Sequence, residues 1–320
     1  MKRRKFIATS AMSVPLLSMF PANLSSIARD MAKGKMEKRA LGKTGEKLSM
    51  IGFGGIVVDK ATPEQAAARV KEAIDAGINY FDVAPSYGNA EEMLGPALEP
   101  YRKNVFLACK TTERKREGAR KELEQSLKYL RTDHFDLYQL HAVTTLEDVD
   151  TIFAKGGAME TFVEAREEGK VKYLGFSAHS VEAAMALMDG YDFDTILFPF
   201  NFATWYAGNF GPQVMEKARE KEMGILALKA MAWRRWEEGE ERNIDKTWYK
   251  PFTDKEEARE GLRFTLSHPV TAAIPPGHEK LFSMALKLAK DFSPMDEQEI
   301  QSIKKKAMQT EPLFSYPMQT

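Results

Sequence analysis

A regular alternation of short apolar strands and helical segments constrains this chain more than any other feature of its sequence. The predicted strands are rich in β-branched and aromatic residues and cover 49–54, 79–84, 104–110, 135–141, 172–177, 195–201, 224–230 and 271–277. Amphipathic segments lie between them at 63–76, 115–130, 157–168, 181–188, 212–222, 255–267 and 279–290. This alternation is typical of a parallel sheet. About eight such units in 320 residues predict an α/β protein with one closed (β/α)8 TIM barrel.

An open, doubly wound sheet is the alternative fold. It requires a Gly-x-Gly-x-x-Gly turn after the first strand to hold a dinucleotide. Here Gly52-Phe53-Gly54-Gly55 lacks the third glycine at that spacing, so the closed barrel is favoured. Residues 37–47, with a turn at 43–46, predict a short N-terminal hairpin before the barrel.

Charge and cysteine content narrow the classes of function. The chain has 46 basic and 46 acidic residues, so no bulk electrostatic attraction favours nucleic acid or an anionic membrane. Its single cysteine, Cys109, excludes an intramolecular disulfide. Because Cys109 neighbours Lys110 on a strand, we expect it on the opposite face, as a small buried hydrophobe.

The N-terminal segment differs from the rest. A basic start precedes an apolar run at 6–20, which is too short and too interrupted for a membrane-spanning helix. Arg3-Arg4 resembles a twin-arginine export signal. We therefore expect a leader at 1–33, a barrel at 37–311 and a tail at 312–320. The protein would be exported by the twin-arginine (Tat) machinery to the periplasm; if the leader is only a basic arm, the protein is cytoplasmic.

Polar residues end successive predicted strands. They are Asp82, Lys110, His141, Ser177, Asn201 and Lys229. A barrel builds its active site at the C-terminal strand ends, so these side chains should converge. Alternation also places Lys110 on one face with Phe106 and Ala108, and His141 with Gln139. Taken singly, Asp82 could cap a helix, His141 could be a satisfied core residue and Lys110 could reach solvent.

Together with Tyr87, which follows Asp82 after one short loop, these residues can form a site for acid–base chemistry. A phenol needs a neighbouring cation to act as an acid or base near neutral pH. Lys110 would supply it, Asp82 would hold Lys110, and His141 would bind a carbonyl oxygen. Such a site can protonate an alkoxide while a cofactor supplies hydride.

Asp82, Tyr87, Lys110 and His141 resemble the catalytic tetrad of the aldo-keto reductase family, as do the segments 77–95, 109–111, 130–141 and 169–179 around them. The resemblance runs from Arg39 to Ala285. It implies the barrel fold, reversible carbonyl reduction, and NADP as cofactor with NAD as the alternative. The cofactor-binding residues that we predict are Gly54, Gly55, Ser177, Asn201, Lys229, Ile274, Pro275 and Gly277.

Four positions depart from the family pattern. Ser177-Ala178 stands where many members have Ser-Asn, and Leu197 stands where a nicotinamide-contacting Gln is common. Lys229-Ala230-Met231 replaces Ser-Pro-Leu, and 274–278 lacks the usual Lys or Arg for phosphate. These departures leave the preference between NADP and NAD open.

Aromatic residues follow the sixth and seventh strands and suggest a substrate wall: Trp205, Tyr206, Trp233 and Trp236. With Arg234-Arg235 they would suit a polar carbonyl compound, sugar-like or acidic; loop packing is the alternative. For Lys229, strand alternation predicts the inward face, shared with Ile225 and Ala227, with Asp82 or an anionic ligand group as its partner.

Three functions compete. The first is the oxidoreductase, and the second is a nicotinamide-binding redox sensor or partner subunit with little turnover. The third is a metal-dependent hydrolase or isomerase using Asp82, His141 and His179. The sequence has no His-x-His pair or carboxylate-rich set of strand ends, so we predict no metal site and rank this reading last.

Overall fold

A closed barrel of eight parallel strands forms the centre of the molecule in a computed structural model that describes residues 36–317. The barrel strands are β3 (Phe53–Gly54), β4 (Tyr80–Asp82), β5 (Phe106–Thr111), β6 (Phe135–Val143), β7 (Val171–Ala178), β8 (Thr195–Pro199), β9 (Gly224–Leu228) and β12 (Ala272–Ile274). They pair in this order. Closure comes from a parallel bridge between Ile51 and Ala273, where Gly52 N–H donates to Ala273 O at 3.0 Å. The predicted barrel is confirmed.

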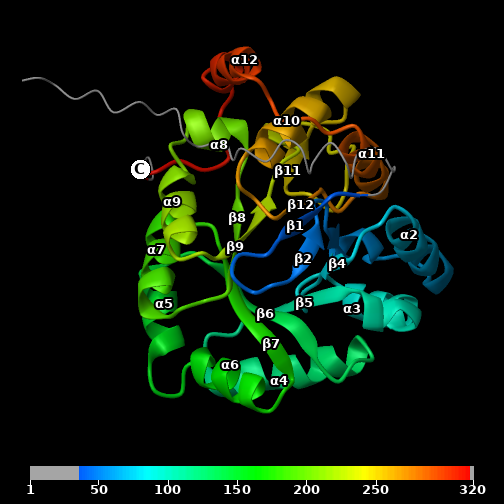
Figure 1. Cartoon of the computed structure of the whole chain (residues 1–320), viewed down its shortest axis with the longest axis vertical. Coiled ribbons are helices and arrows are strands. Elements are labelled where there is room, and N and C mark those ends of the chain that lie inside the picture. The colour runs from blue at the N-terminus through cyan, green and yellow to red at the C-terminus, as the bar shows by residue number, and fades with distance from the viewer. Residues whose placement is uncertain (1–35, 318–320) are drawn as a thin grey trace, which may run out of the picture.

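Helices form an outer ring around the strands (Figure 1). Those predicted from periodicity are α2 (Pro63–Asp75), α4 (Arg116–Tyr129), α6 (Ala158–Glu167), α7 (Val181–Gly190), α9 (Pro212–Glu220), α10 (Lys255–Ser267) and α11 (Glu279–Lys290). Those not predicted are α3 (Ala90–Leu98), α5 (Leu146–Phe153), α8 (Phe202–Tyr206), α12 (Glu297–Ala307) and the 3-10 turns η1 (Gly55–Val58) and η2 (Glu99–Asn104). Pro96 lies inside α3, and a proline normally signals the end of a helix.

A hairpin closes the N-terminal end of the barrel, as predicted. It consists of β1 (Lys38–Ala40) and β2 (Lys47–Ser49), which pair antiparallel and lie over the centre of the barrel in Figure 1. Leu41 and Leu48 from this hairpin join one buried cluster with residues inside the barrel, among them Tyr80, Phe106 and Leu137. The hairpin is therefore the floor of the barrel core.

Side chains along each strand alternate between this inner cluster and the outer layer under the helices. On β5, Phe106 and Ala108 face inward and Cys109 packs outward, as expected. On β9 our assignment of faces was wrong: Leu226 and Leu228 belong to the inner cluster, whereas Ile225 and Ala227 belong to the outer one. Lys229 follows the end of the strand with φ of +68°, so strand alternation does not govern its direction.

A second hairpin and the C-terminal segment pack at the opposite, C-terminal end of the barrel. The hairpin comprises β10 (Ala232–Arg235) and β11 (Tyr249–Pro251), which were not predicted because a long charged loop separates these short strands. Arg235 donates to the carbonyl of Leu313 at 2.8 Å, and the Tyr316 N–H donates to the carbonyl of Gly208 at 2.7 Å. Within residues 36–317 no helix is long and apolar enough to cross a membrane.

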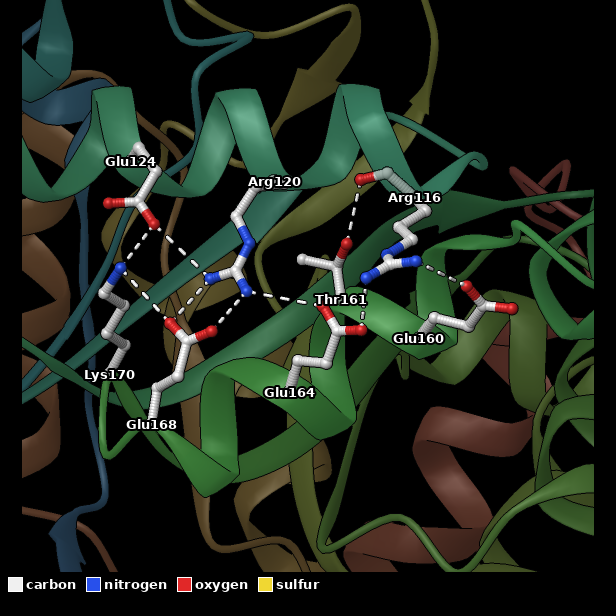
Figure 2. A network of polar contacts seen from close by, with 8 residues as sticks. All are labelled: Arg116, Arg120, Glu124, Glu160, Thr161, Glu164, Glu168 and Lys170. Carbon is white, nitrogen blue, oxygen red and sulfur yellow. Dashed lines mark hydrogen bonds and ion pairs between the residues drawn. The ribbon is translucent and has the colours of Figure 1, made fainter.

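Helices α4 and α6 are joined on the outer surface by a network of ion pairs (Figure 2). Arg116 pairs with Glu164 at 2.6 Å, and Arg120 donates to Glu168 at 2.8 Å. Lys170, at the start of the next strand, pairs with Glu124 at 2.6 Å. The network ties two neighbouring helices of the ring together.

Candidate active site

Asp82 and Lys110 form an ion pair at the C-terminal ends of β4 and β5. The Lys110 ammonium contacts Asp82 Oδ1 and donates to the Val83 carbonyl at 3.2 Å. Asp82 Oδ2 accepts from the Tyr80 hydroxyl and from Gln139 Nε2, both at 3.0 Å. Burial is the largest single effect and favours the neutral amine, but Asp82 and Tyr87 together outweigh it and raise the pKa of Lys110. The predicted pair is present, with its remaining oxygen satisfied.

Tyr87 lies over this pair from the loop after β4. The Lys110 ammonium is 5.3 Å from the centre of the Tyr87 ring, and the His141 ring meets Tyr87 edge-on at 5.6 Å. The structure therefore brings all four predicted catalytic residues together. Burial raises the pKa of Tyr87, and Lys110 only partly opposes this. Lys110 thus acts in the predicted direction but is the smaller effect, so Tyr87 stays protonated at neutral pH and is equipped to donate.

His141 is held as a neutral hydrogen-bond donor. Burial lowers its pKa well below the usual value, and the nearby cations, first among them Lys110, lower it further. Its Nδ1 lies 3.3 Å from the Ser86 hydroxyl. When Nδ1 accepts a hydrogen bond from that hydroxyl, the single ring proton of the neutral imidazole is on Nε2, which can then donate to a carbonyl oxygen. The sequence did not reveal the role of Ser86, or of Tyr80 and Gln139 around Asp82.

A bulge in β6 positions His141. The register between β6 and β7 shifts after Leu140, and Ala142 adopts φ of +52°. The Ala142 N–H donates to the Ser177 hydroxyl at 2.7 Å. Ser177 thus helps to hold the bulge next to His141, in addition to the cofactor role that we predicted for it.

Comparison with known proteins agrees with this geometry. The model of the aldo/keto reductase family matches residues 50–300. This chain belongs to the aldo/keto reductase family. It is 32% identical to L-galactose dehydrogenase of Arabidopsis thaliana over 170 residues, which cover 48% of this chain and 52% of that relative. The chain thus spans about half the length of that relative.

Solved aldo-keto reductases share the fold. AKR11C1 from Bacillus halodurans in its holo form superimposes with a TM-score of 0.70 at 23% identity, covering 88% of this chain and 99% of that one. An aldo/keto reductase from Klebsiella pneumoniae in complex with NADP and acetate gives a TM-score of 0.66 at 19% identity, covering 89% and 99%.

Asn201 presents an unused donor at the end of the sixth barrel strand. Its Oδ1 accepts the Thr204 N–H at 2.9 Å and caps α8. Its buried Nδ2 has no hydrogen-bond partner in the described part of the chain. A buried amide donor normally has an acceptor, and a nicotinamide carboxamide oxygen supplies one. Ser177 accepts from Ala142 but keeps its own proton to donate. Both residues therefore fit the cofactor that the family uses.

The other predicted cofactor residues meet where β3 and β12 close the barrel. Gly54, Gly55, Ile274, Pro275 and Gly277 are all buried there. A side chain at Gly277 would approach Ile56 to 2.3 Å, and one at Gly55 would approach Val83 to 2.6 Å, so glycine is needed for this packing. Lys246, from the loop between β10 and β11, reaches this region and donates to the Val57 carbonyl at 3.1 Å. Sequence reasoning missed Lys246.

Lys229 does not pair with Asp82, contrary to one expectation, because Asp82 is committed to Lys110. Instead the Lys229 ammonium lies over the rings of Tyr249 at 4.6 Å and Trp248 at 5.2 Å. Burial lowers the pKa of Lys229 to about 8. The sequence analysis did not identify Trp248 and Tyr249 as partners of Lys229. The available signal was that these two aromatic residues are adjacent within a charged segment.

The four aromatic residues predicted to line the substrate separate into two pairs. Trp205 packs 4.5 Å from the His268 ring, and Tyr206 packs 5.7 Å from Phe264 of α10. These are contacts of helix packing, the alternative that we had left open. Trp233 and Trp236 lie on the β10–β11 side of the mouth, beneath Lys250 at 4.9 and 5.6 Å. For all four, substrate contact stays a prediction.

Residues 36–317 contain no group of three or more His, Cys, Asp or Glu side chains that could hold a metal ion. Asp82 is occupied by Lys110, and His141 lies against Tyr87. The geometry gives no support to a hydrolase that uses Asp82, His141 and His179 as ligands.

Proposed function

We propose that this protein reduces a small-molecule carbonyl compound, in a reversible reaction dependent on a nicotinamide cofactor, with Tyr87 as the general acid. The single observation that carries the proposal is the buried Asp82–Lys110 pair with Tyr87 and His141 above it. Membership of the aldo/keto reductase family supports oxidoreduction in general. A pure binding protein would not need this arrangement of proton donor and cation.

Each residue has a distinct task in the proposed reaction. His141 donates from Nε2 to the carbonyl oxygen and orients it, and the bound cofactor supplies the hydride. Tyr87 transfers its proton to the oxygen as negative charge develops there. Lys110 stabilises the phenolate that remains, and Asp82 keeps Lys110 in place. In the reverse direction the same phenolate accepts the proton of the alcohol.

We further propose NADP as the cofactor and NAD as the alternative. The family resemblance and the NADP complex of the Klebsiella reductase support it, whereas the lack of Lys or Arg at 274–278 leaves room for NAD. Fluorescence titration with NADPH and NADH, followed by turnover of a simple aldehyde with each, tests both statements. Tight binding without turnover would favour the sensor or partner-subunit function instead.

We also propose export by the twin-arginine route. The supporting residues, Arg3 and Arg4, lie outside the described part of the chain. A pathway that carries folded cargo suits a protein that must load its cofactor before leaving the cytoplasm. We expect the parent protein in the periplasmic fraction, and Arg3→Lys with Arg4→Lys to retain it in the cytoplasm. If the parent protein were found wholly in the cytoplasm, the leader would be only a basic arm and not an export signal.

A further inference from the structure

Lys229 is a partly buried cation whose contacts are aromatic rings. Within residues 36–317 it makes no ion pair or hydrogen bond to a protein group, and its ammonium lies over the rings of Trp248 and Tyr249. Aromatic faces attract a cation but do not neutralise it. A buried cation is normally paired. A negatively charged ligand group would supply the partner that the described residues do not provide.

The neighbouring groups in the described part of the chain supply no negative charge to balance Lys229, whose pKa is shifted by burial alone and by no carboxylate. Arg235 lies over the same Trp248 ring at 5.5 Å. Burial lowers the pKa of His179 to about 3, and Lys229 contributes to that shift. Lys229 is also one of the cations that depress the pKa of His141. Lys229 thus lies within electrostatic range of the histidine proposed to bind the carbonyl oxygen.

A cavity of about 280 Å³ lies at the end of β7, beside Arg235 and not lined by Lys229 itself. His179, Arg235 and Phe314 are among its lining residues. Phe314 connects the two sides of the mouth, since its ring lies 5.5 Å from His179 and 5.8 Å from Trp248. The acidic side chain that lines the cavity is Glu182, which accepts the Ser180 hydroxyl at 3.0 Å. The volume is enough for a small organic molecule.

We propose that the substrate of this reductase carries a carboxylate, which Lys229 binds while the carbonyl group lies against His141 and Tyr87. The inference rests on the proposed function and names its substrate class. One ammonium group neutralises one charge, so a monoanionic carboxylate matches Lys229 better than a phosphomonoester dianion. The cofactor's pyrophosphate, with one charge on each phosphate, is the competing ligand, and the KM for NADPH distinguishes the two. The φ of +68° at Lys229, uncommon for a residue with a side chain, turns the ammonium away from the strand direction toward Trp248 and Tyr249.

A matched pair of aldehydes tests this directly: 4-formylbenzoate carries the carboxylate, and its methyl ester is the neutral counterpart. We expect the parent enzyme to favour the acid by at least ~10-fold in kcat/KM. Lys229→Met should lower the acid-to-ester ratio by roughly 10- to 100-fold, equivalent to about 1.4 to 2.8 kcal/mol. Lys229→Arg, which keeps the charge, should retain most of the preference.

Lys250→Met is the matched control. Lys250 also lies over two aromatic rings of the same hairpin, Trp233 and Trp236, but it has a carboxylate partner in Glu240. Its removal should leave the acid-to-ester ratio at the parental value. A fall equal to that of Lys229→Met would mean that general positive charge, and not Lys229, sets the preference, and would overturn the proposal.

The pH dependence supplies a second readout. Because burial lowers the pKa of Lys229 to about 8, its cationic form prevails below that pH and is lost above it. The acid-to-ester ratio should therefore decline as pH rises through about 8. Two titratable groups near Lys229 keep their protonation states across this range: His179 stays neutral because burial lowers its pKa to about 3, and Tyr249 stays protonated because burial raises its pKa.

The remaining outcomes separate the two proposals. A parental ratio near one, or a ratio unchanged by Lys229→Met, overturns the carboxylate site alone. An unchanged ratio with a raised KM for NADPH overturns it as well and assigns Lys229 to the cofactor. No turnover of either aldehyde overturns the proposed function, and this inference with it.

Discussion

The charged groups on the outer ring and those at the barrel mouth are organised in opposite ways. Between α4 and α6 each arginine and lysine in the network faces at least one carboxylate, and the Arg120 guanidinium holds the pKa of Glu168 at about 2. At the mouth, Lys110 is paired with Asp82, whereas Lys229 lies only on aromatic rings. The surface pairs its own charges, and the mouth holds one cation that no carboxylate of the described residues pairs.

Solvent explains much of this difference. Exposed ion pairs are screened and contribute little each, so the outer network serves mainly to orient two helices. In the mouth the charged groups are more deeply buried, and an unpaired buried group is costly unless something binds to it. The Nδ2 of Asn201 resembles Lys229 in this respect, because it is buried and has no hydrogen-bond partner among the described residues. At the mouth, these two unsatisfied groups are the ones for which we propose ligands.

The largest expected effect comes from breaking the buried pair of the mouth. Lys110→Met leaves the Asp82 carboxylate buried, with only Tyr80 and Gln139 as donors. We expect the free energy of unfolding to fall by about 3–5 kcal/mol in urea denaturation. Lys170→Met, which removes a cation from the outer network, should lower it by less than about 1 kcal/mol.

Replacing Asp82 by Asn in the Lys110→Met background should restore part of the lost stability, because it removes the stranded charge. If Lys110→Met and Lys170→Met prove equally mild, the contrast between the buried pair and the surface network does not hold.

The next effect is on catalysis. Tyr87→Phe should reduce kcat for aldehyde reduction by at least ~100-fold, the scale of general-acid catalysis, with NADPH affinity nearly intact. Because burial raises the pKa of Tyr87, its phenol remains protonated from about pH 6 to 9, and this group should cause no decline in reduction there. Steady-state kinetics and a binding titration measure both. A variant as fast as the parent would remove Tyr87 from the mechanism.

The smallest effect belongs to the outer network. Arg120→Ala should lower the free energy of unfolding by about 0.2–1 kcal/mol, and high salt should shrink the difference. The pKa of Glu168 should return from about 2 toward 4.5, which an NMR titration of the carboxylates can follow; Arg120→Lys should restore much of the shift. A loss of several kcal/mol would show that this surface network behaves like a buried one.

Much of the fold follows from short-range patterns. Alternating strands and helices predicted the eight-stranded barrel, and Thr62 with Pro63 correctly marked the start of α2. Short or proline-containing elements were not predicted because their sequence signals were weak or contradictory, as in α3 with its internal Pro96. The β10–β11 hairpin escaped because its strands are joined by residues 236–248, a charged loop without a turn signature.

The sequence by itself determined the barrel and the set Asp82, Tyr87, Lys110 and His141, because polar residues at consecutive strand ends must converge once a barrel closes. Only the tertiary structure decided what surrounds them. The bulge at Ala142, the left-handed turn at Lys229 and the stacking of Lys229 on Trp248 depend on contacts between distant segments. Strand alternation applies only within a regular strand, so it failed for Lys229, which lies just beyond the end of β9.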